Sequence, residues 1–171
     1  MFQALASRVL PLQTKALPRN YAAVASLEGG TGLNEILILE DDVANLKGLS
    51  GLLRSEEYSV LEASNGFQAI EKAKTFGPIS LFISDMELPR FSGTQIALML
   101  ISLYPNMPVL FISGTPRIWW ASRDASNFKL FPPSHVDFIE KPFSLSQLLI
   151  RVRNLIEGAG NIMTGALSNA A

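Results

Sequence analysis

Residues 79–93 read ISLFISDMELPRFSG, a short apolar run that stops at an acid and continues into a loop. A run of this length is typical of a strand that is buried on both faces. Two further apolar runs, 35–39 and 136–139, are also followed by charged residues. The charged residues after the three runs are Asp85, Glu40-Asp41 and Glu140-Lys141. In an open parallel sheet the carboxyl ends of the strands share one crevice, so these side chains are predicted to meet there.

Strand and helix patterns alternate along the chain. Apolar residues recur at three- and four-residue steps in the helical segments, whereas the strand segments are short apolar runs. The expected strands are 35–39, 58–62, 79–84, 109–112 and 136–139, and the expected helices are 43–55, 66–75 after Asn65 as cap, 94–103, and 145–157 after Ser144 as cap. Because parallel strands need crossover connections, this alternation predicts an α/β fold with helices on both faces of a parallel sheet.

Length and composition limit the classes of function. The 171 residues suffice for one ordinary domain, and a hydrophobic content of 48% is enough for a single core. A net charge of -1 argues against general attraction to nucleic acid or to an anionic membrane. The chain has no cysteine, which excludes disulfides, thiolate metal sites and a cysteine nucleophile. No apolar stretch approaches the ~20 residues that span a bilayer, so we expect a soluble, cytoplasmic protein without a membrane or nucleic-acid partner.

One domain, 34–157, is expected between two tails. Residues 1–33 combine basic residues and prolines with a Gly-rich joint, and are predicted to be a disordered extension. An upstream start codon would explain the segment equally well, and a targeting peptide is the less favoured alternative. Residues 158–171 carry no charge and are expected to form a flexible tail after a final helix that ends near Glu157. No output domain is expected to follow.

The acids Glu40, Asp41 and Asp85, together with the ammonium of Lys141, indicate a magnesium-dependent phosphoryl site. Mg²⁺ is a hard cation that takes oxygen ligands and keeps several waters. Without a cation, clustered carboxylates repel one another and their pKa values rise. A metal ion would offset that repulsion and bridge to phosphoryl oxygens. We therefore expect Mg²⁺ as the cofactor.

Four motifs, taken in this order, resemble the response regulator receiver family, the phosphoacceptor half of two-component signalling. The motifs are Ile36 to Asp41, Ser84 to Gly93, Ile112 to Gly114 and Asp137 to Phe143. The resemblance covers Glu35 to Glu157, which is most of the chain. It implies the flavodoxin-like (βα)5 fold, a doubly wound parallel sheet with strand order 2-1-3-4-5, and this order is taken over from the family.

The resemblance also implies how a phosphoryl group and a metal ion would be bound. Asp85 is expected to be the phosphoacceptor, whose carboxylate attacks the phosphorus of a phosphohistidine. Glu40, Asp41 and Asp85 would hold Mg²⁺, together with the backbone carbonyl of Glu87. Asp42 follows the acidic pair but is interpreted as the start of a helix, where an acid is favourable near the positive end of the helix dipole.

Three further residues match family positions that contact the phosphoryl group or change conformation when it is present. Lys141 is expected to pair with a phosphoryl oxygen, and Ser113 to donate a hydrogen bond to the aspartyl phosphate and draw its loop inward. Phe138 occupies the aromatic switch position, whose ring is expected to turn inward when Ser113 moves. Ordinary strand packing explains an aromatic residue at that position almost equally well.

The segment between Gly114 and Val136 departs most from the family pattern. It is longer than usual and contains Trp119-Trp120 and Pro132-Pro133. In the family this segment carries the fourth helix, part of the surface that changes on phosphorylation. We expect one tryptophan ring to pack inside and the other to face solvent, where it could anchor a partner. His135, the only histidine, is interpreted as a loop residue.

These observations favour a single-domain response regulator rather than a turnover enzyme. A sensor histidine kinase or phosphotransfer protein would phosphorylate Asp85, and an unknown downstream protein would read the changed face or receive the phosphoryl group. Self-phosphorylation and dephosphorylation would be its intrinsic chemistry. One alternative is a phosphorylation-independent scaffold that binds through residues 115–133. An aspartate-nucleophile phosphatase is disfavoured because Glu87 stands where such enzymes usually place a second aspartate.

Overall fold

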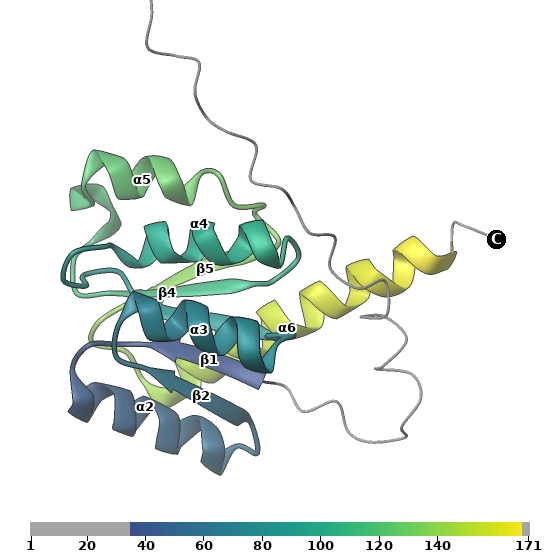
Figure 1. The fold of residues 1–171 in the computed structure, drawn as a ribbon, viewed down its shortest axis with the longest axis horizontal. Coiled ribbons are helices and arrows are strands. Elements are labelled where there is room, and N and C mark those ends of the chain that lie inside the picture. The colour runs from purple at the N-terminus through teal and green to yellow at the C-terminus, as the bar shows by residue number, and fades with distance from the viewer. Residues whose placement is uncertain (1–34, 169–171) are drawn as a thin grey trace, which may run out of the picture. The chain divides into compact units, whose positions relative to one another are not determined.

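The centre of the protein is a five-stranded parallel sheet. The computed structural model describes residues 35–168, and the side chains of residues 35–159. The strand order is β2-β1-β3-β4-β5, which confirms the predicted fold class and order (Figure 1). The strands are β1 (Glu35–Leu39), β2 (Ser59–Ala63), β3 (Leu81–Asp85), β4 (Val109–Ser113) and β5 (Val136–Glu140). In Figure 1 they run from right to left, so their carboxyl ends share the left edge of the sheet.

Different helices cover the two faces of the sheet. The helices are α2 (Val43–Ser55), α3 (Gly66–Phe76), α4 (Gly93–Leu103), the 3-10 turn η1 (Arg117–Trp119), α5 (Ser122–Phe128) and α6 (Leu145–Ser168). Successive side chains of a strand point to opposite faces. Ile36 and Ile38 of β1 therefore pack with residues of α2 and α6, whereas Leu37 and Leu39 pack with residues of α3 and α4. Burial on both faces explains why the strands are nearly continuous apolar runs.

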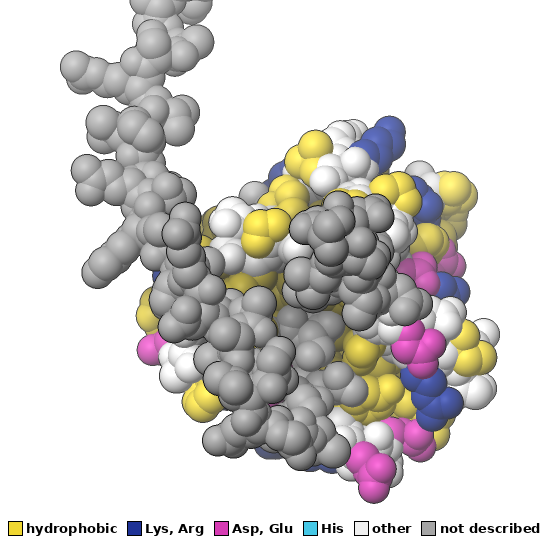
Figure 2. All heavy atoms as spheres, turned by 90° about the vertical axis from the view of Figure 1, so that its right-hand side faces the viewer, with side chains coloured by type: hydrophobic (Ala, Val, Ile, Leu, Met, Phe, Trp, Pro, Cys, Tyr) yellow, Lys and Arg dark blue, Asp and Glu magenta, His cyan; other side chains and the backbone are white. Residues whose placement is uncertain are grey.

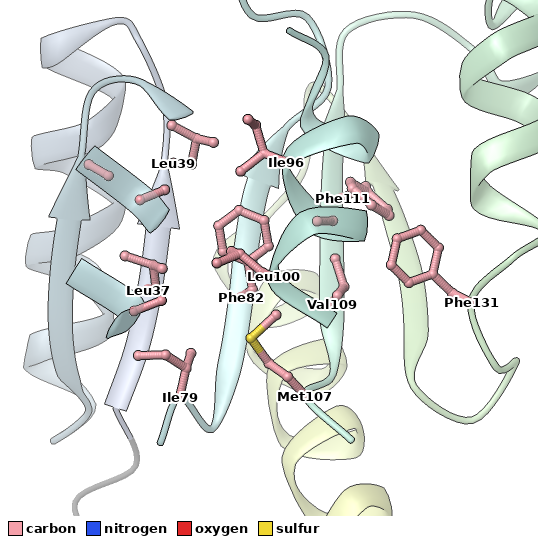
Figure 3. Packing of buried hydrophobic residues seen from close by; sticks show 14 of the residues in the cluster. Leu37, Leu39, Ile79, Phe82, Ile96, Leu100, Met107, Val109, Phe111 and Phe131 are labelled. Carbon is pink, nitrogen blue, oxygen red and sulfur yellow. The ribbon is translucent and has the colours of Figure 1, made fainter. Parts of the chain in front are cut away.

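The core on the α3 and α4 side contains several large side chains. Figure 3 shows Phe82 close to Leu100 of α4, and Phe111 of β4 facing Phe131. The rings of Phe111 and Phe131 meet edge to face, with centroids 5.6 Å apart. Phe131 comes from the segment between β4 and β5, so these rings join that segment to the sheet.

Polar side chains cap the helices where the sequence predicts them. Asp42 and Asn65 each accept a hydrogen bond from the backbone N–H three residues further on, at 2.8 and 3.0 Å. Ser144 Oγ accepts one in the same way at 3.2 Å. Such caps satisfy backbone N–H groups that have no partner inside the helix. The interpretation of Asp42 as a helix-start acid is confirmed.

The predicted strand boundaries differ from those of the structure by at most two residues, and the predicted end of the last helix differs by more. α6 continues to Ser168, so the predicted helix end near Glu157 is wrong and residues 158–168 are helical. Gly158 does not end the helix, because an interior glycine costs only about 1 kcal/mol and none of the described glycines has the positive φ typical of a helix end. The predicted flexibility of 158–171 stays a prediction, and the extension predicted for 1–33 lies outside the described residues.

The segment between β4 and β5 contains the turn η1 and the short helix α5. Trp119 is 71% exposed, whereas the ring of Trp120 packs edge to face on Phe128 and Phe138. The expectation of one ring inside and one outside is therefore confirmed. His135 lies in the loop before β5, as predicted, and is buried.

The surface shown in Figure 2 is seen from the amino ends of the strands. Its described part mixes acidic, basic and hydrophobic side chains. Within residues 35–168, no helix is long and apolar enough to cross a membrane.

Candidate functional site

The carboxyl ends of four strands carry the predicted site residues. β1 is followed by Glu40, β3 ends at Asp85, β4 ends at Ser113, and β5 is followed by Lys141. These strands are neighbours in the sheet, and Asp85 is in register with Ile112, the residue before Ser113. The backbone N–H of Lys141 donates to the carbonyl of Ser113 at 2.8 Å. The sheet therefore brings these four candidate residues to one edge.

Lys141 contacts two carboxylates. Its Nζ lies 2.5 Å from Asp85 Oδ2 and 3.3 Å from Glu40 Oε2. Asp85 and Glu40 are only 6% and 4% exposed, and the Lys141 side chain is partly buried. Charges in such surroundings interact more strongly than they do in water. One ammonium therefore faces two carboxylates, which it cannot both neutralise.

The pKa values of Glu40 and Lys141 reflect this crowding. Burial raises the pKa of Glu40, the charge of Asp85 raises it further, and Lys141 only partly opposes both effects. Burial lowers the pKa of Lys141, but the hydrogen bond to Asp85 and the charges of Asp85 and Glu40 outweigh burial, so this pKa is raised. Lys141 therefore remains an ammonium at neutral pH and can donate to an incoming anion.

Glu87 reaches the site with its backbone and with its side chain. Its backbone N–H donates to Asp85 Oδ1 at 2.8 Å, which fixes the second oxygen of that carboxylate. Its carboxylate accepts a hydrogen bond from the Gly114 N–H at 3.1 Å and lies 3.2 Å from Ser113 Oγ. The single hydroxyl proton of Ser113 has a second, nearer acceptor, the Thr115 carbonyl at 2.8 Å. The sequence predicts only the backbone carbonyl of Glu87 as a ligand, and that assignment stays a prediction.

Gly93 allows the loop after β3 to fold back against the strand. Its backbone N–H donates to the carbonyl of Met86 at 3.2 Å. A Cβ at this position would overlap the backbone oxygen of Asp85 and would lie 2.6 Å from Ser84 Oγ. A residue with a side chain would have to displace the backbone of Asp85 itself. This close approach explains the glycine that follows Asp85 in the motif.

Glu40 and Asp85 could hold a cation, but Asp41 does not gather with them. Across the described residues, no three His, Cys, Asp or Glu side chains lie close enough together to hold a metal ion. Asp41 is exposed and lines a separate hollow with Arg90 and Phe91. The predicted cluster of three carboxylates is therefore not formed by these side chains, and the role of Asp41 as a ligand stays a prediction. The two remaining carboxylates still fit Mg²⁺, which is usually bound through one or two carboxylates and several waters.

Ser113 is connected to Phe138 through Thr115 and Trp120. Ser113 Oγ accepts from the Thr115 N–H at 3.0 Å, and the Thr115 carbonyl accepts from Trp120 Nε1–H at 2.9 Å. The Trp120 ring packs on Phe138 with centroids 5.3 Å apart. Sequence reasoning did not find Thr115, because it acts through backbone groups that any residue type would supply. The switch role of Phe138 stays a prediction.

Asp124, a second residue that the sequence did not reveal, ties α5 to the start of α4. It is 8% exposed, and its Oδ1 accepts from Ser92 Oγ at 2.5 Å and from Thr94 Oγ1 at 2.7 Å. Ser92 closes the loop that begins after Asp85. Hydrogen bonds to an ionised carboxylate are stronger than neutral ones, so this contact fixes α5 against that loop. The partners are 32 and 30 residues apart in the chain, which leaves no local sequence pattern.

Comparison with known proteins agrees with this geometry. The response regulator receiver domain family matches residues 36–153. The sensor kinase CckA of Brucella abortus is 30% identical over 128 residues, which are 74% of this chain and 13% of that kinase. The response regulator RR06 of Streptococcus pneumoniae is 31% identical over 121 residues, which are 71% of this chain and 52% of the regulator. The chain thus spans about half or less of the length of these curated relatives.

A solved structure shows the same fold. The receiver protein of Sinorhizobium medicae aligns with a TM-score of 0.65 at 29% identity, over 75% of this chain and 98% of that protein. Three observations agree: the shared arrangement of strands and helices, the family match over most of the chain, and the four residues at the strand ends. The chain belongs to the response regulator receiver family of two-component signalling, whose domain serves as a phosphoacceptor.

Proposed function

We propose that Asp85 accepts a phosphoryl group from a histidine kinase or phosphotransfer protein, and that the protein acts as a single-domain response regulator. The observation that carries this proposal is the setting of the Asp85 carboxylate. It is buried at the end of β3, with one oxygen 2.5 Å from Lys141 Nζ and the other 2.8 Å from the Glu87 N–H. Such contacts hold a carboxylate in one orientation, which is what an in-line attack on phosphorus requires.

The transfer step uses groups that are already near Asp85. A carboxylate oxygen forms the new bond to phosphorus while the bond from phosphorus to the histidine nitrogen breaks, and the imidazole leaves with that electron pair. Lys141 can then pair with a phosphoryl oxygen. The Gly114 N–H, which now donates to Glu87, can donate to another phosphoryl oxygen once the Glu87 carboxylate turns away. The Ser113 hydroxyl can do the same once it leaves its present acceptors, the Thr115 carbonyl and Glu87.

Mg²⁺ fits this site as the cofactor of the proposal. Glu40 and Asp85 would hold it, with Asp41 and the backbone carbonyl of Glu87 as further candidate ligands. When bound, it would neutralise the charge that Lys141 leaves uncompensated and that a phosphoryl group would increase. Glu40, whose pKa is raised by burial and by Asp85, would then be held in its ionised form.

Phosphorylation would be read at a distance through the contacts of Ser113. If Ser113 turns toward the phosphoryl group, its hydrogen bond with the Thr115 N–H must change, and the Thr115 carbonyl also holds Trp120. Trp120 in turn packs on Phe138, the proposed switch residue. A downstream protein would then recognise the changed surface. In this proposal the protein is a cytoplasmic phosphoacceptor with no turnover substrate, no nucleic-acid partner and no membrane partner.

A phosphorylation-independent scaffold is the second candidate function. It is favoured by the exposure of Ile118 and Trp119, which are 84% and 71% exposed in the present arrangement of the site. Such side chains could bind a partner without any change at Asp85. Equal partner affinity for wild type and Asp85→Asn, with and without a phosphodonor, would favour the scaffold.

Intact-protein mass after incubation with acetyl phosphate tests the main proposal. Wild type, Asp85→Asn and Asp42→Asn are compared with and without Mg²⁺. Asp42→Asn is the matched control, because it removes a neighbouring carboxylate while asparagine can still cap α2. We expect one phosphoryl adduct on wild type and on the control, only with Mg²⁺, and none on Asp85→Asn. An adduct on Asp85→Asn, or its formation without Mg²⁺, would contradict the proposal.

A further inference from the structure

A hollow of about 370 Å³ lies between the loops that follow β1, β2 and β3. It is lined by Asp41, by residues 64–67 at the start of α3, and by residues 88–91 in the loop before α4. We call it the Asp41 hollow. Except for Asp41, a candidate metal ligand, none of its lining residues has a role in the proposed phosphoryl transfer. The hollow is therefore a surface feature that the site at the strand ends does not explain.

The α3 side of the Asp41 hollow is already well bonded within the chain. Gly66 lines the hollow, and a Cβ at Gly66 would overlap the side chain of Ile96 in α4, so the two helices meet closely there. Ser64 Oγ donates to Gln68 Oε1 at 3.1 Å, and Asn65 Oδ1 accepts from the Gln68 N–H at 3.0 Å. These uncharged polar groups therefore offer little to a second molecule.

Asp41 and Arg90 are the two charged residues of the lining. Both are exposed, and among the described residues neither forms an ion pair, with the other or with any third residue. Two further acids are close in the chain but are hydrogen-bonded elsewhere: Asp42 caps α2, and Glu87 accepts from the Gly114 N–H. The Asp41 hollow thus presents one carboxylate and one guanidinium to another molecule.

Arg90 occupies a strained position in its loop. Its φ is 73°, and the Phe91 N–H donates to the carbonyl of Pro89 at 3.0 Å, so Arg90 is the central residue of a γ-turn with positive φ, which is the rare kind. Glycine, asparagine or aspartate would adopt this backbone at lower cost. Because no ion pair among the described residues offsets the cost, the side chain of Arg90 is available to a partner outside the chain.

Two phenylalanine rings stand beside these charges. Phe67, in the first turn of α3, is 76% exposed, and Phe91, directly after Arg90, is 49% exposed. Both line the hollow. Exposed aromatic rings next to an arginine are the composition of binding hot spots. A surface that has protruding rings beside a hollow is also complementary to itself, because a ring of one copy can enter the hollow of another.

We propose that the Asp41 hollow joins two copies of this chain about a two-fold axis, with Asp41 of each copy paired to Arg90 of the other and the exposed rings packed between them. In a two-fold pair the same surface is used twice, so a surface with one acid and one base meets its own complement. A strongly acidic or strongly basic partner would satisfy one of the two charges and repel the other. The net charge of -1 opposes self-association only slightly.

The paired surface is small, so we expect weak association. Its centre consists of two rings and two charged side chains from each copy, whereas a standard interface has about 20–30 residues a side. A dissociation constant of about 10–100 μM is therefore expected. Added salt should weaken the pair, because its ion pairs lie near the surface.

Self-association competes with phosphoryl transfer in this proposal. The loop that carries Arg90 begins at Asp85, and Asp41 directly follows Glu40. A second copy on the hollow therefore lies beside the phosphoacceptor and obstructs a protein that donates phosphoryl groups. Donor binding and pairing then weaken each other by the same factor. This competition rests on the proposed function, whereas the pairing itself does not.

Two charge-reversal variants of the full chain test the pairing, alone and together, by sedimentation velocity. Asp41→Arg leaves two bases in the hollow, and Arg90→Asp leaves two acids, while aspartate tolerates the left-handed backbone. Wild type should associate as its concentration rises, whereas each variant should stay monomeric up to about 500 μM, because like charges then face each other. An equimolar mixture of the two variants should associate again, since each base then faces an acid. This recovery also shows that both variants are folded.

Phe67→Gln tests the aromatic part of the pair. We expect it to weaken self-association at least about tenfold, because the ring is the most exposed part of the surface. Phe76→Gln is the matched control, since Phe76 is 56% exposed at the other end of the same helix and does not line the hollow. This control should associate as wild type does, and equal weakening by the two variants would contradict the proposed surface.

Several outcomes would overturn the proposal. They are a wild type that stays monomeric up to about 500 μM, single charge variants that associate as wild type does, or a mixture that stays monomeric while wild type associates. A different occupant is also detectable. If wild type is monomeric and Phe67→Gln slows phosphoryl transfer from a phosphorylated histidine phosphotransfer domain but not from acetyl phosphate, the hollow binds the donor rather than a second copy.

Self-association of Asp85→Asn separates this inference from the proposed function. Without a phosphodonor, this variant should associate as wild type does, which supports the pairing whatever Asp85 does. If acetyl phosphate yields no adduct on wild type, the proposed function fails while association of the mixed variants still supports the pairing. If transfer from a phosphotransfer domain is equally fast below and above the dissociation constant, the competition is wrong while the pairing stands.

Discussion

The helix α4 and the segment 115–135 pack against the same face of the sheet but are held there in different ways. α4 has eleven residues and buries small and aliphatic side chains such as Ile96, Ala97 and Leu100. The helix α5 has seven residues, of which only Asp124 is buried. The segment 115–135 is instead attached by aromatic rings before and after α5 and by the carboxylate of Asp124.

This difference shows two ways of fixing a chain to a sheet. A regular helix gains its position from a periodic apolar stripe, which the sequence displays. The segment 115–135 gains its position from a few strong contacts to distant residues, and it leaves Ile118 and Trp119 exposed. A segment held at few points can expose apolar and cationic groups on its outer side, such as Ile118, Trp119 and Arg117.

Replacing Phe111 should cause the largest loss of stability. Its ring is fully buried and meets the rings of Phe128 and Phe131 at 5.9 and 5.6 Å. We expect Phe111→Ala to lower the free energy of unfolding by about 3–5 kcal/mol, measured by urea denaturation. Leu100→Ala, on the buried side of α4, should lower the free energy of unfolding by a comparable amount, about 2–5 kcal/mol.

Near-UV circular dichroism distinguishes the two losses. Phe111→Ala should change the tryptophan signal, because Phe128 packs on Trp120, whereas Leu100→Ala should leave this signal nearly unchanged. Phe67→Ala, at a ring 76% exposed, is the control and should stay within about 0.5 kcal/mol of wild type. Equal changes of the tryptophan signal in both core variants would contradict the distinction between the two regions.

Removing the carboxylate of Asp124 should have the next largest effect. Asp124→Ala leaves the buried hydroxyls of Ser92 and Thr94 without their acceptor, so we expect a loss of about 2 kcal/mol in urea denaturation. A double-mutant cycle with Ser92→Ala should show a coupling above about 0.5 kcal/mol. Additive effects would mean that the contact between α4 and α5 contributes little to stability.

The contrast between α4 and the segment 115–135 also explains how much of the fold the sequence predicts. The helix 43–55 is predicted with both ends correct, because its apolar steps lie between the cap Asp42 and a clear turn. The strand order could only be taken over from the family, since an apolar run does not specify its neighbours. The end of α6 is predicted wrongly, because Gly158 is a weak stop signal without a left-handed backbone conformation.

The candidate site is predicted in part for a related reason. Glu40, Asp85, Ser113 and Lys141 meet because strand ends of a parallel sheet converge, which is a property of the fold class. Asp41 points to a different hollow, since adjacent residues after a strand need not share a direction. The contacts of Glu87 with Ser113 and of Asp124 with Ser92 join distant segments, and no spacing rule in one sequence reveals them.

Trp120 and Trp119 allow a smaller test of the aromatic attachment. Trp120→Phe keeps a ring but loses the Nε1–H bond to the carbonyl of Thr115, so we expect a loss of about 1 kcal/mol in thermal or urea denaturation. Trp119→Phe is the matched control at the exposed neighbour and should change stability by less than about 0.5 kcal/mol. Similar values for both variants would remove Trp120 from the contacts that hold this segment.

The smallest effect is expected at Glu62, on the opposite side of the sheet, where charges rather than rings attach a helix. Its carboxylate lies 2.6 Å from Lys47 and 2.7 Å from Arg54 of α2, and these hydrogen bonds lower its pKa from 4.5 to about 2. The unfolded chain therefore takes up this proton at a higher pH than the folded protein does. The stabilisation is fully present above the unfolded value and is lost as pH falls toward about 2.

Wild type should accordingly lose more stability than Glu62→Gln as the pH is lowered from about 5 to about 3. The difference should stay within about 1 kcal/mol, because both cations are largely exposed and screened by water. Added salt should shrink it further, whereas the loss caused by Phe111→Ala should persist in salt. An equal salt response in the two variants would mean that the attachment of α2 and that of the segment 115–135 do not differ in kind.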